Sequence, residues 1–280
     1  MSPHISIKAE TIFELFGFPI TNSFLTTLIV LFVSFFIGRY YFVQISKKER
    51  SLVFYALQSL FLGIYNMLHS VLHKNTNRFY SLLGAFFFFI LMANWSGLIP
   101  GVGSILIKPF VHEKEIKEEL TIPVDEPVVH LEEESNGENV VEKEHVAKLI
   151  PLLRGGTADL NSTIALALIT VFMTQFYGFK FLGPIDHLKK YLDFRDPIMI
   201  MLGPLEIIQE FARIISFSFR LYGNIFAGEV LLTIVPFLLP IAFSFVVAPM
   251  FFMEIFVGFV QALVFVMLSA VFLNMSISHH

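Results

Sequence analysis

The amino-acid sequence predicts an all-α membrane protein with about five membrane helices and one interfacial amphipathic helix, in which the last two membrane helices form a long tilted hairpin. Of the 280 residues, 55% are hydrophobic and 34 are phenylalanine, and the mean hydropathy is +0.72. Several apolar runs reach the roughly 20 residues that a helix needs to cross a bilayer. Soluble domains seldom combine these features, so we expect the chain to lie in a membrane.

Composition also restricts the function. The chain has no cysteine, which excludes disulfides and thiol chemistry. It has no glycine-rich phosphate-binding motif and no nucleophile or histidine-rich metal set in its apolar part. We therefore expect no catalytic residue, no cofactor, no metal and no nucleic-acid partner. The first twenty residues lack the features of a cleaved signal peptide.

The first predicted membrane spans follow a mixed N-terminal segment, 1–20. Residues 21–103 contain two of them, at 22–43 and 79–99, each apolar enough for one crossing. Trp95 lies near the end of the second span, where an aromatic belt is expected.

Residues 51–73, between these spans, have a polar and an apolar face. The apolar side chains recur at helical spacing, at Leu57, Leu60, Phe61, Ile64, Leu68 and Val71. Polar side chains interrupt the remaining positions, at Gln58, Asn66, His69 and His73. This pattern is typical of an interfacial or protein-packed helix, with a short span as the alternative. Two histidines four apart could ligate a metal, but no carboxylate accompanies them, which favours interfacial packing.

The middle of the chain changes from acidic to apolar. Residues 104–150 form a predicted external loop that holds twelve of the 23 acids but few lysines, as is typical of a solvated segment. A third span lies within 151–183, and Asp159 and Asn161 stand at its start. An aspartate before an apolar run is typical of a helix cap. The same carboxylate could line an ion path, and the two roles are compatible.

The hairpin is predicted over 196–277. Asp196-Pro197 opens a helix that continues to residue 235, and Pro236 and Pro240 mark a turn before a partner helix. The first of these helices would be roughly 60 Å long, against a hydrocarbon core of roughly 30 Å. It must therefore tilt or lie partly along the membrane.

The basic loops predict the orientation. The segments 44–50, 74–78 and 180–195 hold most of the lysine and arginine and are expected on the cytoplasmic side. The acidic loop and the turn of the hairpin then lie outside, as does the N-terminus.

Charged residues in the hairpin are the main pointer to function, since each costs roughly 2.5–3.5 kcal/mol near a bilayer centre. Spacings of four and seven residues place several of them on one helix face: Glu206, Arg213, Ser216, Arg220 and Asn224. For Arg213 and its acidic neighbours Glu206 and Glu210, pairing that only holds helices together is an equally good explanation. Arg220 has no acid within one turn of its own helix, so its partner is expected on another chain.

Folding the hairpin about residue 239 predicts two polar clusters. Arg220 and Asn224 come level with Gln261 near mid-membrane. Glu229 comes level with Glu254, and Asp159 is expected towards the same outer side. These clusters are the candidate path for an ion.

The sequence resembles subunit a of the F-type ATP synthase. The motif R-L-Y-G-N-x-x-A-G-E at 220–229 and F-V-Q-A-L-V-F at 259–265 carry the resemblance. The E-L-F-G-F-P-I-T-N-S segment at 14–23, the N-W-x-G-L-I-P loop and T-A-D-L-N extend it along the chain. The acidic loop lies outside it.

The resemblance implies an ion-translocating stator subunit that provides two offset proton half-channels to a rotating c-ring. Arg220 would face the ring and separate the channels, with Asn224 and Gln261 as its companions. The outer half-channel would be lined by Glu229, Glu254, Asp159 and Asn161. Many relatives have a histidine paired with a carboxylate in this cluster, whereas both positions here are glutamate.

The implied partners are the c-ring, the peripheral-stalk subunit b and membrane lipid, and the implied ion is H⁺, with Na⁺ as the alternative. The expected location is a bacterial plasma membrane, as a multi-pass protein with no catalytic chemistry of its own. A stand-alone channel or secondary transporter is the competing hypothesis, but such transporters often contain internal repeats, and none is evident here.

Overall fold

The computed structural model describes residues 9–47, 49–99, 102–103, 105–107, 150–183, 197–238 and 243–277. Helices dominate these ranges, as predicted. They are α1 (Asn22–Ile45), α2 (Leu52–Leu72), α3 (Thr76–Ser96), α5 (Leu160–Leu182), α7 (Pro197–Leu238) and α8 (Phe243–Ile277), with the short 3₁₀ helices η1 (His73–Asn75) and η2 (Gly156–Ala158). Most of the predicted acidic loop and basic segment, at 108–149 and 184–196, lies outside the described residues.

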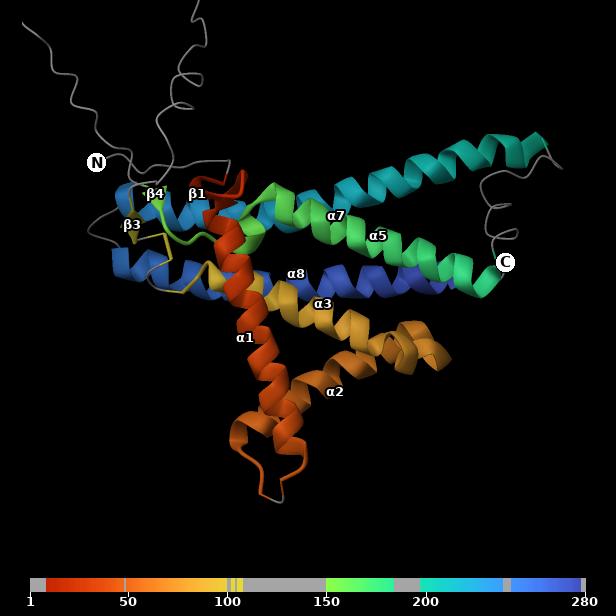
Figure 1. Cartoon of the computed structure of the whole chain (residues 1–280), viewed down its shortest axis with the longest axis horizontal. Coiled ribbons are helices and arrows are strands. Elements are labelled where there is room, and N and C mark those ends of the chain that lie inside the picture. The colour runs from red at the N-terminus through yellow and green to blue at the C-terminus, as the bar shows by residue number, and fades with distance from the viewer. Residues whose placement is uncertain are drawn as a thin grey trace, which may run out of the picture.

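Two small antiparallel sheets were not predicted. Strands β1 (Thr11–Leu15) and β2 (Phe18–Thr21) form a hairpin directly before α1, and β3 (Leu106–Ile107) pairs with β4 (Ile150–Pro151). Both sheets lie at the end of the molecule where α1 begins (Figure 1). The second sheet joins the two ends of the acidic segment, so it fixes where the chain re-enters the helical part.

Helices α3, α5, α7 and α8 form the bundle, and α1 crosses its end at a steep angle (Figure 1). The buried core lies mainly between α3 and α8. Its members are large apolar side chains spaced along the facing helices, including Phe79, Leu83, Phe87, Ile90, Phe217, Leu221, Ala262, Phe265 and Val266. The Phe217 and Phe265 ring centroids are 4.9 Å apart and join α7 to α8.

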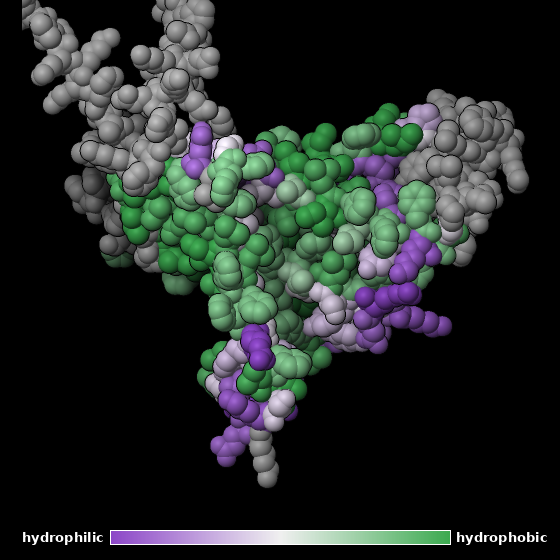
Figure 2. All heavy atoms as spheres, in the orientation of Figure 1, coloured by the Kyte–Doolittle hydropathy of each residue, from purple (hydrophilic) through white to green (hydrophobic). Residues whose placement is uncertain are grey.

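The outer surface is strongly apolar. On α1 the side chains of Phe32, Phe35 and Phe42 are more than 60% exposed. Apolar residues cover the sides of the helices, whereas polar residues gather where α1 leads into α2 and where α2 leads into α3 (Figure 2). A surface of this kind suits hydrocarbon rather than water.

Within the described ranges, four stretches are long and apolar enough to cross a membrane: Asn22–Ile45, Leu52–Ser96, Leu160–Leu182 and Val247–Ile277. The second joins α2 and α3, which η1 separates at His73, where φ is 47°. The structure is therefore that of a helical membrane protein. The predicted number of spans and their orientation stay predictions.

The amphipathic character predicted for 51–73 is confirmed. All six apolar positions of the predicted stripe are buried or half-buried in α2, while Gln58, Asn66, His69 and His73 are exposed. The buried face packs on α3 and α8. Whether α2 lies at the membrane interface stays a prediction.

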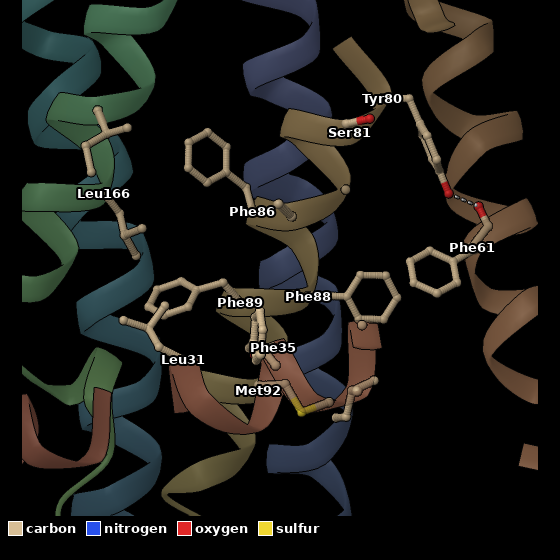
Figure 3. A pocket seen from close by; sticks show the side chains of 16 residues that line it. Leu31, Phe35, Phe61, Tyr80, Ser81, Phe86, Phe88, Phe89, Met92 and Leu166 are labelled. Atoms are coloured by element: carbon tan, nitrogen blue, oxygen red, sulfur yellow. Dashed lines mark hydrogen bonds between the residues drawn. The ribbon is translucent and has the colours of Figure 1, made fainter. Parts of the chain in front are cut away.

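A cavity of about 710 Å³ opens between α1, α2, α3 and α5. Aromatic and aliphatic side chains such as Phe35, Phe61, Phe88 and Leu166 point into it (Figure 3). The Tyr80 hydroxyl donates to the Phe61 carbonyl oxygen at 3.0 Å on one wall. Its lining is almost wholly apolar and therefore suited to hydrocarbon.

Helices α7 and α8 pack on each other, but the turn expected between them is largely undescribed, because 239–242 lie outside the described residues. The hairpin itself thus stays a prediction. Folding about residue 239 pairs residues whose numbers average 239. In the observed contacts, Phe217–Phe265 and Gly228–Glu254, the two residue numbers average 241. Helix α3 ends at Ser96 rather than at 99, because the chain turns at Gly97, where it touches Gly155.

Candidate functional site

A partly buried group of charged side chains lies where α1 begins, α3 ends and α5 begins. We call Arg154, Asp159, Glu229 and Glu254 the outer cluster. These four side chains come from the segment after β4, the cap of α5, α7 and α8, respectively. Arg154 and Asp159 are buried, and the two glutamates are half-buried.

Two glycines allow the segment that carries Arg154 to enter the bundle. A Cβ on Gly156 would lie 2.9 Å from Thr27 Oγ1 of α1, and a Cβ on Gly155 would lie 3.4 Å from the Gly97 Cα at the end of α3. Side chains there would force the segment outwards. Its close approach lets the Arg154 backbone N–H donate to Thr26 Oγ1 at 3.3 Å.

Arg154 forms an ion pair with Glu229 of α7. The Arg154 Nε lies 3.2 Å from Glu229 Oε1 and donates to Oε2 at 3.3 Å. Its guanidinium carbon also lies 5.8 Å from the centre of the Phe226 ring, one turn earlier on α7. The arginine side chain is 6% exposed and the glutamate side chain 40%. A buried arginine therefore meets a carboxylate that opens to the surface.

Glu254 of α8 lies against α7 at the residue before Glu229. Its carboxylate occupies the space above Gly228, so that a Cβ at that position would overlap it. Because Gly228 directly precedes Glu229, the two carboxylates lie at one level, as the hairpin depth predicts. Within the described residues Glu254 makes no hydrogen bond and no ion pair.

Asp159 is the N-cap of α5. Its Oδ1 accepts from the Asn161 backbone N–H at 3.3 Å, and its Oδ2 accepts from Ser23 Oγ of α1 at 3.0 Å. The side chain is buried. The predicted cap is therefore confirmed, and the bond to Ser23 also ties α5 to α1. The Asn161 side chain is exposed and contributes through its backbone.

Arg220 lies further along α7, away from the outer cluster. It is half-buried, and its Nη2 donates to Ser216 Oγ at 3.4 Å, one turn earlier, as the spacing of four predicts. No ion pair involving Arg220 occurs among the described residues. Since an arginine keeps its proton, the site has a fixed positive charge that no carboxylate of the described chain neutralises.

The predicted companions of Arg220 differ in exposure. Asn224 is exposed, whereas Gln261 on α8 is half-buried. Their neighbours in sequence, Leu221 and Ala262, are both buried in the core between α7 and α8. Arg220 and Gln261 thus lie at a similar level without a hydrogen bond between them in the described part of the chain.

The charges nearest the start of α7 include a structural pair. Arg213 Nη1 lies 2.9 Å from Glu210 Oε2, and both side chains are largely buried. The Arg213 guanidinium also stacks over the Phe272 ring of α8 at 3.9 Å. The ion pair lies within α7 and the stacking on Phe272 joins α7 to α8, which favours the structural explanation for this pair. Glu206, one turn earlier, is half-buried.

A clamp formed by α3 positions the part of α8 that carries Glu254 and Gln261. Asn94 Nδ2 donates to the Gly258 carbonyl oxygen at 2.9 Å, and Trp95 Nε1 donates to that of Ile255 at 3.1 Å. Thr157 Oγ1 of η2 donates to Asn94 Oδ1 at 2.8 Å. A Cβ on Gly258 would lie 3.3 Å from Asn94 Cβ, so the glycine allows the close approach.

Sequence reasoning missed Arg154 and Asn94. Arg154 carried a signal, because it is a basic residue placed on the predicted outer side, where the positive-inside distribution leaves few. Two glycines after it also indicated a tightly packed segment. Asn94 begins the N-W-x-G-L-I-P segment that carries part of the resemblance, but nothing in the local sequence indicated its bond to α8.

The chain is similar to one family of known proteins along most of its length. A family model described as ATP synthase A chain matches residues 20–274. ATP synthase subunit a of Desulforamulus reducens is 38% identical over 146 residues, which are 47% of this chain and 50% of the relative. The Bacillus subtilis (strain 168) subunit a is 39% identical over 137 residues, or 44% of this chain and 54% of the relative. That of Macrococcus caseolyticus is 40% identical over 130 residues, again 44% of this chain and 52% of the relative.

The chain spans about half the length of the curated relatives it matches. The family model covers far more of it, from β2 to the last turns of α8. The residues that the family model matches include all four members of the outer cluster and Arg220. The chain belongs to the ATP synthase A chain family.

Proposed function

We propose that the protein is the ion-translocating stator subunit of the membrane sector of an ATP synthase. It provides two offset half-channels to a rotating ring of c subunits, and Arg220 separates them. The observation that carries this proposal is that Arg220, in an apolar bundle, forms no ion pair with any described residue, while a separate group of carboxylates lies towards the proposed outer side. Family membership supports it.

The outer half-channel leads past Glu229, Glu254 and Asp159 to the ring. A proton that enters there neutralises a carboxylate on a ring subunit, and the neutral site then turns into the lipid. After nearly a full turn the site reaches the inner half-channel and releases the proton. The membrane potential contributes about 2.3 kcal/mol per charge for each 100 mV.

Arg220 acts as the barrier between the two half-channels. Its guanidinium attracts the deprotonated ring carboxylate and repels a proton that would otherwise pass straight from one side to the other. Asn224 is exposed on the same face of α7, where it can meet the ring, and Gln261 approaches from α8. Ser216 orients the guanidinium through its hydroxyl.

The partners of this function are the c-ring, the peripheral-stalk subunit b and the lipid of a bacterial plasma membrane. The relatives are bacterial proteins, and the exposed phenylalanines of α1 offer an apolar face to lipid or to a partner helix. The chain performs no bond chemistry itself. Nucleotide chemistry belongs to the soluble part of the complex.

Purification from the native membrane tests this assignment against a stand-alone channel or secondary transporter. A stator subunit is expected to purify with a ring of small subunits and with subunit b, whereas recovery of the chain alone in an active form would contradict the proposal. ATP-driven acidification of vesicles, measured with and without sodium, then identifies the ion. Acidification that proceeds without sodium identifies H⁺.

A further inference from the structure

Arg154 is a buried cation in the outer cluster whose role the half-channel scheme leaves unassigned. It is 5% exposed, and the segment that carries it is held by the Thr26 hydroxyl and by close glycine contacts to α1 and α3. Its position is therefore fixed by the first part of the chain. Its ionic partner Glu229 belongs to α7, 75 residues later.

The geometry distinguishes the two glutamates of the cluster. Glu229 meets Arg154 through both of its oxygens, at 3.2 and 3.3 Å. Glu254 lies over Gly228, the residue before Glu229, with no hydrogen bond or ion pair in the described part of the chain. A guanidinium favours the charged form of the carboxylate beside it, whereas Glu254 has no cation at its side within the described residues.

We propose that Arg154 is a positioning residue of the outer half-channel, which holds Glu229 as a fixed counter-charge and leaves Glu254 to exchange the proton. This inference rests on the proposed function. A proton from an external hydronium ion converts the Glu254 carboxylate to the acid and leaves water. The same proton then passes to the ring carboxylate, and Glu254 returns to its charged form.

A purely structural role for Arg154 is the competing explanation, in which the arginine only fastens the segment after β4 to α7. The backbone bond to Thr26 and the contacts of Gly155 and Gly156 already fasten this segment without the guanidinium. Within the described part of the chain, the guanidinium contacts the Glu229 carboxylate and the Phe226 ring, both on α7. These contacts act on α7 and on Glu229.

A double-mutant cycle in the complete ATP synthase tests the proposal. Arg154→Gln, Glu229→Gln and the double variant are compared in inverted membrane vesicles by ATP-driven acidification, normalised to the subunit present in the membrane. We expect Arg154→Gln alone to lower the rate about tenfold or more, and the double variant to lose far less than the product of the two single losses. Arg154→Lys is expected to recover part of the rate, because it restores the charge without the fork of donors.

Arg78→Gln is the matched control, since Arg78 stacks over the Phe181 ring at 4.4 Å, far from the outer cluster, and is expected to keep normal rates. Losses that simply multiply, or an Arg154→Lys variant no better than Arg154→Gln at equal subunit levels, would overturn the inference. Arg220→Ala is measured in parallel. If Arg220→Ala pumps fully, the proposed function fails; if it does not pump while the cycle shows no coupling, only the role of Arg154 fails.

Discussion

The carboxylate of Glu254 fills the space that a side chain at Gly228 would occupy. Through this contact, α8 brings a carboxylate to the residue that precedes Glu229, so that the two acids lie at the same level of the bundle. The absence of a Cβ at Gly228 is therefore a condition for the site. The contact depends on how closely α7 and α8 pack, which composition alone does not predict.

Gly228→Ala is expected to displace the Glu254 carboxylate and to lower ATP-driven proton pumping about tenfold, since alanine fits the helix but not this contact. Gly63→Ala is the control, because a Cβ at Gly63 of α2 meets nothing within 4 Å. Acidification of membrane vesicles measures both variants. Equal pumping by the two would show that the position of Glu254 does not matter.

Neutralising the two glutamates should have different effects. Glu229→Gln leaves the buried Arg154 without its carboxylate, so the free energy of unfolding is expected to fall by about 1–3 kcal/mol. We expect a value at the lower end of this range because the Glu229 side chain is 40% exposed. Glu254→Gln breaks no ion pair or hydrogen bond of the described chain, so it should leave stability unchanged and reduce pumping. Thermal unfolding of the purified complex separates the two. A stability loss in Glu254→Gln as large as that in Glu229→Gln would contradict this division.

Asp159 can be tested for its two roles separately. Asp159→Asn keeps a good helix cap and an acceptor for Ser23, so stability should change by less than about 0.5 kcal/mol, whereas Asp159→Ala should cost about 1 kcal/mol. If the carboxylate lines the outer half-channel, Asp159→Asn still slows pumping several-fold. Full pumping by this variant would show that Asp159 acts only as a helix cap.

Asn94→Ala should destabilise the bundle by about 2–3 kcal/mol. It removes the amide that bonds the Gly258 carbonyl oxygen and leaves the buried Thr157 hydroxyl without its acceptor. Asn66→Ala is the control, because Asn66 is exposed on α2. The midpoint of thermal unfolding measures the difference, and similar midpoints for the two variants would show that the clamp contributes little.

The sequence predicted those parts of the molecule that depend on local pattern. Helices α1 and α5 begin within a residue of the predicted positions, since an apolar run and a cap such as Asp159 define a helix start locally. The buried face of α2 was also predicted correctly, because the helical spacing of its apolar residues determines which face is buried. Helix geometry also predicted that Glu229 and Glu254 lie at a similar depth along the paired helices. The observed pairing of α7 and α8 is centred on residue 241 rather than on residue 239.

The parts that were missed depend on contacts between distant segments. The partner of Arg154 lies 75 residues away, and that of Asn94 lies 164 residues away. The β1–β2 hairpin turns at Phe16 and Gly17, both with positive φ, and phenylalanine is an unusual residue in that conformation. No periodic pattern marks such features.

The proposed separation of two half-channels by Arg220 is tested most directly by ATP-driven acidification together with passive proton leak in vesicles carrying Arg220→Ala. We expect loss of pumping and a faster leak, and a failure of Arg220→Lys as well if the guanidinium fork is needed. The control is the double variant Glu210→Gln/Arg213→Gln, which removes a structural pair on the same helix and should keep pumping. Full ATP-driven pumping by the Arg220→Ala membranes would contradict this role of Arg220.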